Sequence, residues 1–167
     1  ADGSSRLMAG RVQGGGGGAA CRGLKCWQRG DERRLIRSRE PARVAGTGVL
    51  ADAGDTLHVD LPAYGKSRRV VGSGRGDAFM GTDFSMDDLA RTRFRDEYSA
   101  ELQGEDETHW RIKLVPLAPA DHAHAHLLMR VRKADDLFDV VEFVDGEGQV
   151  ERKIEFGDVR PDGGYDV

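Results

Sequence analysis

Three histidines at alternate positions form the pattern in this sequence that most resembles a site for chemistry. They are His122, His124 and His126, directly preceded by Asp121. Alternate residues of a strand point to one face, so these imidazoles would reach a single metal ion there, and zinc and nickel both favour imidazole. The sequence supplies no identifiable further ligand, and a polar edge before a strand explains the run more simply. We therefore predict no metal and no cofactor.

Groups suited to covalent or acid–base catalysis are poorly arranged. Ser73 lacks the G-x-S-x-G spacing of a nucleophile elbow, and the glycines at 72–76 lack the dinucleotide fingerprint. Asp83, Asp87 and Asp88 cluster, but a helix cap and a favourable interaction with the helix dipole explain them. We expect a binding protein rather than an enzyme. The catalytic alternative is a metal-dependent enzyme that uses the histidine run.

Arginines gather in two short stretches. Beside a cavity mouth they would meet lipid phosphates or an acidic partner surface, whereas on a solvated strand face they need no function. Both interpretations stay open for Arg33, Arg34, Arg37, Arg68 and Arg69.

Charge and hydropathy exclude some function classes. The chain has 25 basic and 29 acidic side chains, interspersed, with a net charge of −4, which argues against a nucleic-acid-binding protein. No stretch approaches the roughly 18–20 apolar residues of a membrane span. The first residues lack a basic and then apolar leader, so we expect a signal peptide to have been removed or not included. Cys21 and Cys26 lack a disulfide or zinc pattern and are predicted to be small buried residues.

Short strand-like runs separated by turn signals follow one another along most of the chain. Alternation of apolar and polar residues is clearest at 56–61, 97–102 and 109–114, and Asp-Gly-Glu-Gly at 145–148 is typical of a hairpin turn. This succession of short alternating runs and turn residues predicts an antiparallel meander. The full set of predicted strands is 24–27, 33–37, 47–50, 56–61, 68–71, 97–102, 109–114, 127–133, 138–144 and 150–156.

The middle of the chain interrupts the strands. Ser85 and Asp88 have the spacing of a capping box and predict a short helix at about 86–92. Just before it, large apolar residues stand in a stretch rich in Gly and Asp, with no strand or helix period. They must cover something apolar, either as a loop that plugs one end of the core or as a lid over a ligand cavity. These residues are Phe79, Met80, Phe84 and Met86.

Several short motifs occur in the order found in one known family. Residues 27–31 join a tryptophan to Arg-Gly, and residues 46–50 read Gly-Thr-Gly-Val-Leu. The most specific block is Phe-Met-Gly-Thr-Asp-Phe-Ser at 79–85, followed by Asp-Asp-Leu at 87–89. Over residues 24–160 the chain resembles the LolA-like outer membrane lipoprotein-sorting proteins of the lipoprotein carrier superfamily. Relative to that family we expect a chain truncated at both ends.

The resemblance implies a mainly β fold (α+β): a curved antiparallel sheet or incomplete β-barrel, with a short helix or loop as a lid. Residues 1–20 are expected to be a poorly structured Gly-rich segment, and 21–167 a half-barrel domain. The implied function is a periplasmic carrier or chaperone that holds acyl chains and takes part in outer membrane lipoprotein sorting. Its implied partners are lipid or lipoprotein acyl chains, an inner-membrane transporter and an outer-membrane acceptor. The alternative is a lipid-responsive sensor or scaffold domain that binds an envelope protein without transport.

On such a sheet one row of side chains along each strand points inward and lines a cavity if the barrel is not filled. The same rows would otherwise pack against one another as a core. The expected lining and lid residues are Leu35, Leu57, Val59, Phe79, Met80, Phe84, Met86, Trp110, Ile112, Leu114, Met129, Val131 and Phe156, and the expected polar mouth is Arg68 and Arg69.

Overall fold

The structure is a computed structural model that describes residues 5–14, 22–29, 33–39, 42, 45–52, 56–79, 84–91 and 93–161. The chain divides into two compact units. The first unit comprises residues 1–11, 22–92 and 157–167, and the second comprises residues 12–21 and 93–156. Each unit is described by itself below.

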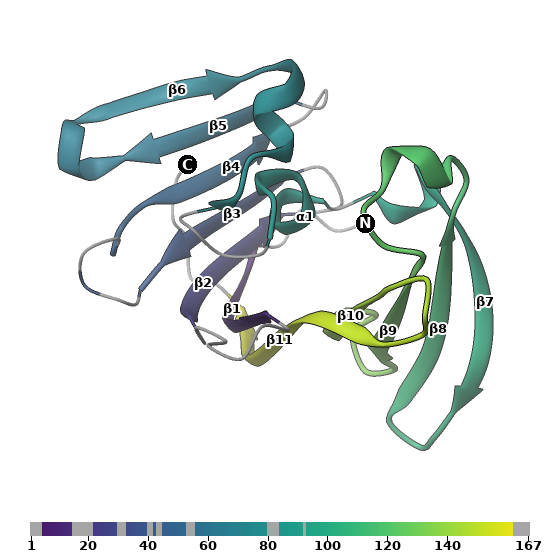
Figure 1. The fold of residues 1–167 in the computed structure, drawn as a ribbon. Helices are drawn as coiled ribbons and strands as arrows, with labels where there is room; N and C mark the ends of the chain where they lie inside the picture. The colour runs from purple at the N-terminus through teal and green to yellow at the C-terminus, as the bar shows by residue number, and fades with distance from the viewer. Residues whose placement is uncertain are drawn as a thin grey trace. The chain divides into compact units, whose positions relative to one another are not determined.

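The first unit is a meander of antiparallel strands (Figure 1). Each strand pairs with the next one in sequence, and short 3-10 turns η2 (Pro62–Tyr64) and η3 (Gly72–Gly76) flank the last strand. The strands are β2 (Arg22–Arg29), β3 (Arg33–Ser38), β4 (Gly48–Asp52), β5 (Thr56–Leu61) and β6 (Lys66–Val70).

The second unit is also an antiparallel meander, drawn in green to yellow in Figure 1. The 3-10 turns η5 (Phe94–Asp96) and η6 (Pro119–Asp121) precede its first and third strands. The strands are β7 (Tyr98–Glu105), β8 (His109–Pro116), β9 (His126–Arg132), β10 (Phe138–Val144) and β11 (Val150–Pro161), of which β11 continues into the first unit from residue 157.

The hydrogen-bonded strand order is β6-β5-β4-β3-β2-β1-β11-β10-β9-β8-β7, in which β1 is Ser5–Gly14. The two end strands, β6 and β7, are not neighbours in this order, so the described sheet is not closed. The predicted fold class, mainly β with an open antiparallel sheet and short helices, is confirmed. The predicted strands from residue 24 onward coincide with β2 to β11 to within a few residues.

A short helix, α1 (Met86–Ala90), covers part of the first unit's sheet. Its capping box is complete: the Ser85 hydroxyl accepts from the Asp88 amide at 3.0 Å, and the Asp88 carboxylate accepts from the Ser85 amide at 3.1 Å. The helix contacts β3 and β4 and buries Leu89 and Ala90. The capping residues therefore fix where the chain turns back over the sheet.

Aromatic rings form much of the second unit's core. Phe138 lies edge-on to Phe94, with 5.7 Å between ring centroids, and packs against Phe156 at 5.6 Å. Phe94 also contacts Tyr98 at 6.0 Å. Tilted and edge-to-face pairs of this kind contribute about 0.5–1.5 kcal/mol each beyond their buried area. This cluster joins η5 to the first residues of β7 and β10 and to the middle of β11.

The expectation for residues 1–20 needs correction over residues 5–14, which form the strand β1. Met8 is 1% exposed, so β1 contributes to the core. The sequence signal was weak because residues 5–14 show no regular alternation of apolar and polar side chains, although β1 neighbours the next strand, β2, as well as β11 in the sheet. Residues 1–4 and 15–20, including the glycine run, lie outside the described residues, as does Cys21. Cys26 is fully buried, as predicted.

Candidate functional site

The register of the second unit brings most of the expected lining residues to one sheet face. Directly paired residues of antiparallel strands point to the same side. Trp110 pairs with Val131, and Ile112 pairs with Met129. Leu114 continues the Trp110 and Ile112 row along β8, so these five predicted residues share a face, which we call the apolar face.

The apolar face continues across β10 and β11. Met129 pairs with Val141, which pairs with Ile154 of β11. Phe156 follows Ile154 by two residues and therefore lies on the same side. All six lining residues predicted in the second unit thus belong to one surface.

Burial changes along this face from one end to the other. Leu114, Leu127 and Phe143 are 5%, 0% and 2% exposed. Trp110, Ile112 and Val131 are only half-buried. Leu102, which pairs with Ile112, is 65% exposed, so apolar surface remains uncovered at this end. We call Leu102, Trp110, Ile112 and Val131 the open end of the apolar face.

Sequence reasoning missed Leu102 as a site residue. It stands in an alternating stretch, at a position that pairs with Ile112 once the β7–β8 hairpin forms. This pairing with Ile112 could have identified Leu102 as a residue of the same face.

Charged groups lie beside the open end. The Lys133 ammonium is 5.7 Å from the Trp110 ring centroid and 2.6 Å from the Glu105 carboxylate. The hydrogen bond from Lys133, together with its charge, holds the pKa of Glu105 below its ordinary value. The tryptophan is therefore bordered by polar groups.

In the first unit, the expected lining residues Leu57 and Val59 are core residues. Val59 pairs with Val49, which pairs with Ile36, so these three side chains share a face. All of them are at most 3% exposed, and α1 packs over β3 and β4. Leu35 is a correction: it neighbours Ile36 and pairs with Leu50, so it lies on the opposite face and cannot join Leu57 and Val59 in one row.

The segment with the distinctive Phe-Met-Gly block folds back on itself at its two described ends. The Phe79 amide donates to the Phe84 carbonyl at 2.7 Å, and Ala78 forms a bridge with Ser85. Phe79 and Phe84 are each 1% exposed. They therefore add to the core of the first unit. Met86 is half-buried on α1, and Met80 lies outside the described residues.

The arginine stretches do not form one solvated face. Arg34 is 3% exposed, and its guanidinium donates to the Arg91 carbonyl at 2.8 Å, the Gln28 side chain at 2.7 Å and the Leu89 carbonyl at 3.5 Å. It therefore caps the C-terminal carbonyls of α1. Burial lowers the pKa of Arg34 and raises that of the neighbouring Cys26 thiol.

The other four arginines are at the surface or half-buried. Arg33 pairs with Asp52 at 2.7 Å and Arg37 with Asp60 at 2.9 Å. The remaining two, Arg68 and Arg69, are exposed neighbours on β6, so they project to opposite faces.

The histidine run does not lie on one strand, which corrects the alternation argument. Of the three, only His126 is in β9. His122 and His124 instead share the Tyr98 hydroxyl, at 3.2 Å from the His122 Nδ1 and 2.9 Å from the His124 Nε2. Burial and the nearby Lys113 lower the pKa of His126. Among the described residues, no group of three or more His, Cys, Asp or Glu side chains is placed to hold a metal ion.

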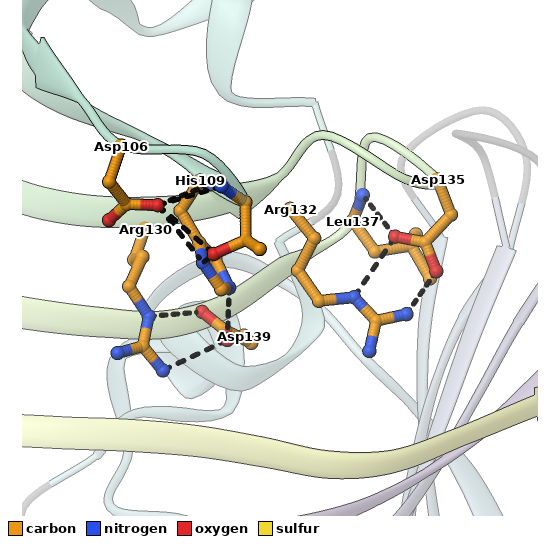
Figure 2. A network of polar contacts seen from close by, with 8 residues as sticks. Asp106, His109, Arg130, Arg132, Asp135, Leu137 and Asp139 are labelled. Carbon is orange, nitrogen blue, oxygen red and sulfur yellow. Dashed lines mark hydrogen bonds and ion pairs between the residues drawn. The ribbon is translucent and has the colours of Figure 1, made fainter.

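A polar network that the sequence did not reveal ties the β7–β8 turn to β10 (Figure 2). The Asp106 carboxylate accepts from the Thr108 and His109 amides at 2.9 Å and 2.8 Å, which lowers the pKa of Asp106 to about 2. The His109 Nε2 is 3.0 Å from Asp139, and Arg130 donates two hydrogen bonds to the same carboxylate. Because each group is held by a neighbour, the network serves to fix the hairpin.

The comparisons with known proteins agree with this fold. A family model with the description "-like: Uncharacterized protein" matches residues 30–167. The chain belongs to that family. A comparison with curated proteins found no match. Among the described residues, no helix is long and apolar enough to cross a membrane.

Three solved structures illustrate the likeness. A DUF1329 family protein from Desulfovibrio piger has 22% identity and a TM-score of 0.63, over 99% of this chain and 89% of that one. An outer membrane lipoprotein-sorting protein domain from Vibrio parahaemolyticus has 14% identity and a TM-score of 0.62, over 98% and 87%. A LolA superfamily protein from Nitrosomonas europaea has 15% identity and a TM-score of 0.53, also over 98% and 87%. The predicted LolA-like fold is therefore confirmed.

The same fold also occurs in a protein solved with a partner, the MucA/MucB complex of Pseudomonas aeruginosa. That match has 12% identity and a TM-score of 0.55, and it covers 98% of this chain but 53% of the other.

Proposed function

We propose that the protein binds acyl chains of a lipid or lipoprotein on the apolar face of the second unit. The observation that carries this proposal is the open end of that face, where Leu102 is 65% exposed and three further apolar side chains are half-buried. A face that only completed the core would be expected to be covered along its whole length. Its apolar end is bordered by the Lys133 and Glu105 charges, as suits a ligand with an apolar chain and a polar head.

The free energy available to such a ligand is large. Each buried methylene contributes about 0.8 kcal/mol, so a sixteen-carbon chain gives roughly 12 kcal/mol before the costs of ordering are subtracted. The flexible, polarizable side chain of Met129 lets this face adapt to chains of different lengths. No catalytic group is required, because binding and release are the whole activity.

A role in outer membrane lipoprotein sorting is part of the proposal. The likeness to a lipoprotein-sorting domain supports it. In that role the protein is a periplasmic carrier that receives its ligand from an inner-membrane transporter and delivers it to an outer-membrane acceptor. We propose no reaction and no cofactor.

Two neighbouring residues of β8 provide a matched test. Ile112 lies on the apolar face, and Lys113, the next residue, points to the opposite face. We expect Ile112→Glu to weaken uptake of a fluorescent sixteen-carbon fatty acid at least tenfold, because a carboxylate would be buried against the chain. Lys113→Glu should leave uptake within about twofold of the unchanged protein.

Native mass spectrometry of protein purified without detergent gives an independent measurement, in which a bound lipid is expected. Equal uptake by the Ile112→Glu and Lys113→Glu variants would contradict the proposed face. Absence of uptake by the unchanged chain would contradict acyl binding itself.

A second candidate function is a lipid-responsive scaffold that binds an envelope protein without transport. The observation favouring it is the occurrence of this fold in a complex of two proteins, MucA and MucB. A pull-down from envelope extract that retains a protein equally well from the unchanged chain and the Ile112→Glu variant would favour the scaffold. Transfer of a bound fluorescent fatty acid from the protein to acceptor vesicles would favour a carrier.

A further inference from the structure

The last strand of the first unit concentrates positive charge at a sheet edge. Lys66, Arg68 and Arg69 of β6 are all exposed. β6 stands at one end of the strand order and pairs only with β5 among the described strands. Within the described part of the chain none of these three side chains has an ion-pair partner. Among the described residues, the outer edge of β6 therefore offers backbone groups without a strand partner, together with cations without an ion-pair partner.

The cations flank this edge on both sides. Arg68 pairs with Val59 and Arg69 pairs with His58, so the two guanidinium groups lie on opposite faces. Lys66 is two residues before Arg68 and shares its face. A strand that added to β6 would also send successive side chains to the two faces, and those opposite positions 66, 68 and 69 would lie beside a cation.

From this arrangement we infer that the β6 edge binds an extended acidic segment of a partner protein, which adds to the sheet as a further strand. Main-chain hydrogen bonds would supply much of the affinity, and carboxylates opposite Lys66, Arg68 and Arg69 would supply the selectivity. A second copy of this chain is a poor occupant, because two β6 edges would place like charges opposite each other.

The length and the ends of the edge define the segment. The five residues of β6 span about 17 Å, which suits a partner segment of about five residues. Tyr64 and Val71 flank the strand and are 74% and 66% exposed. They provide apolar contacts for residues at either end of an acidic partner strand.

An anionic membrane is the competing occupant of a basic edge. A membrane that met the edge would bind the guanidinium groups but would supply no main-chain hydrogen bonds to β6, whereas an extended protein segment supplies both kinds of contact. The observations therefore favour an extended protein segment.

The test uses the whole chain and a labelled acidic peptide, TVEEVET, whose adjacent glutamates would meet Arg68 and Arg69. Fluorescence anisotropy at low salt is expected to show saturable binding that weakens as salt rises. The double variant Arg68→Glu/Arg69→Glu should lose at least tenfold in affinity. A matched double variant, Arg111→Glu/Lys113→Glu, makes the same change in net charge on the second unit and should bind within about twofold of the unchanged chain.

Two further measurements separate strand addition from simple charge attraction. A fully N-methylated peptide of the same sequence keeps the charge but lacks amide donors, and it should not bind. Hydrogen exchange should show new protection at residues 66–70 when the unmethylated peptide is bound.

Absence of peptide binding, equal binding of the N-methylated peptide, or equal losses in the two double variants would overturn the inference. It would also be overturned if Arg68→Glu/Arg69→Glu abolished binding to phosphatidylglycerol vesicles while leaving peptide binding unchanged.

Discussion

Each of the two units of this protein carries an apolar sheet face, but the two faces are covered differently. In the first unit, α1 packs against β3 and β4, and the sheet side chains Ile36 and Val59 are at most 3% exposed. Phe79 and Phe84, each 1% exposed, add to this core. In the second unit, Phe143 is buried, whereas Trp110 is half-buried and Leu102 is exposed. The same alternating sequence pattern thus yields a filled core in one unit and a partly uncovered surface in the other. The difference teaches that the covering segment, rather than the strands, decides which face is available to a ligand.

The largest effect expected from this comparison concerns Phe84. Phe84→Ala removes a ring that is 1% exposed, and we expect a loss of about 3–5 kcal/mol in unfolding free energy because the space cannot fully collapse. Leu102→Ala, at 65% exposure, should change stability by no more than about 0.5 kcal/mol. Urea denaturation measures both, and similar losses in the two variants would remove the contrast between the units.

The second-largest effect on stability is expected from the buried guanidinium of Arg34. Arg34→Met leaves the carbonyls of Leu89 and Arg91 without their donor, and we expect a cost of about 2–4 kcal/mol. Arg33→Met breaks only an exposed pair with Asp52 and should cost about 0–1 kcal/mol. Thermal melts of the two variants compare them directly, and an Arg34→Met protein as stable as Arg33→Met would show that α1 does not depend on this cap.

The capping box of α1 has a smaller effect. Ser85→Ala removes the hydroxyl that accepts from the Asp88 amide, and we expect a loss of about 1 kcal/mol. Ser67→Ala, on the exposed β6, should be nearly neutral. The check is urea denaturation, with hydrogen exchange of the α1 amides as a local readout. Unchanged exchange in Ser85→Ala would argue that the packing of Leu89 alone holds the helix.

The smallest effect concerns the turn of the second unit. The Thr108 and His109 amides lower the pKa of Asp106 from 3.8 to about 2, so ionised Asp106 stabilises the folded hairpin above pH 4. This contribution should be lost as the pH falls from about 4 through 2, since the protonated carboxyl is a poorer acceptor. A titration of the Asp106 carboxyl by NMR should give a midpoint near 2, and Asp106→Asn should flatten the pH dependence. A midpoint near 4 would mean that the turn does not hold this carboxylate.

Much of the fold could be predicted because its signals are local. Alternation and turn residues located β2 to β11, and Ser85 with Asp88 located α1. The strand β1 was missed because its own residues show no regular alternation, and one of its two neighbours in the sheet, β11, lies near the other end of the chain. Arg34 looks like a surface residue for a related reason: its acceptor at Leu89 lies 55 positions away, so its burial depends on tertiary structure.

The candidate site was predictable in part. The spacing of apolar residues along β8 identified the row that contains Trp110 and Ile112. Spacing within one strand does not show which residues of the neighbouring strands lie on the same face, because that depends on the register. Leu35 was therefore grouped with residues of the opposite face, and Leu102 was omitted. The alternation argument that would have placed the three histidines on one face does not apply, since residues 122–125 precede β9.

Photolabelling with a sixteen-carbon fatty acid that carries a diazirine on its chain tests the binding site most directly. After irradiation and digestion, mass spectrometry locates the modified residues. The account predicts labelling on β7, β8 and β9 at Leu102, Trp110, Ile112 and Val131, with competition by unlabelled fatty acid. Competed labelling concentrated instead on Phe79, Phe84 or α1 would contradict it, because the ligand would then occupy the first unit.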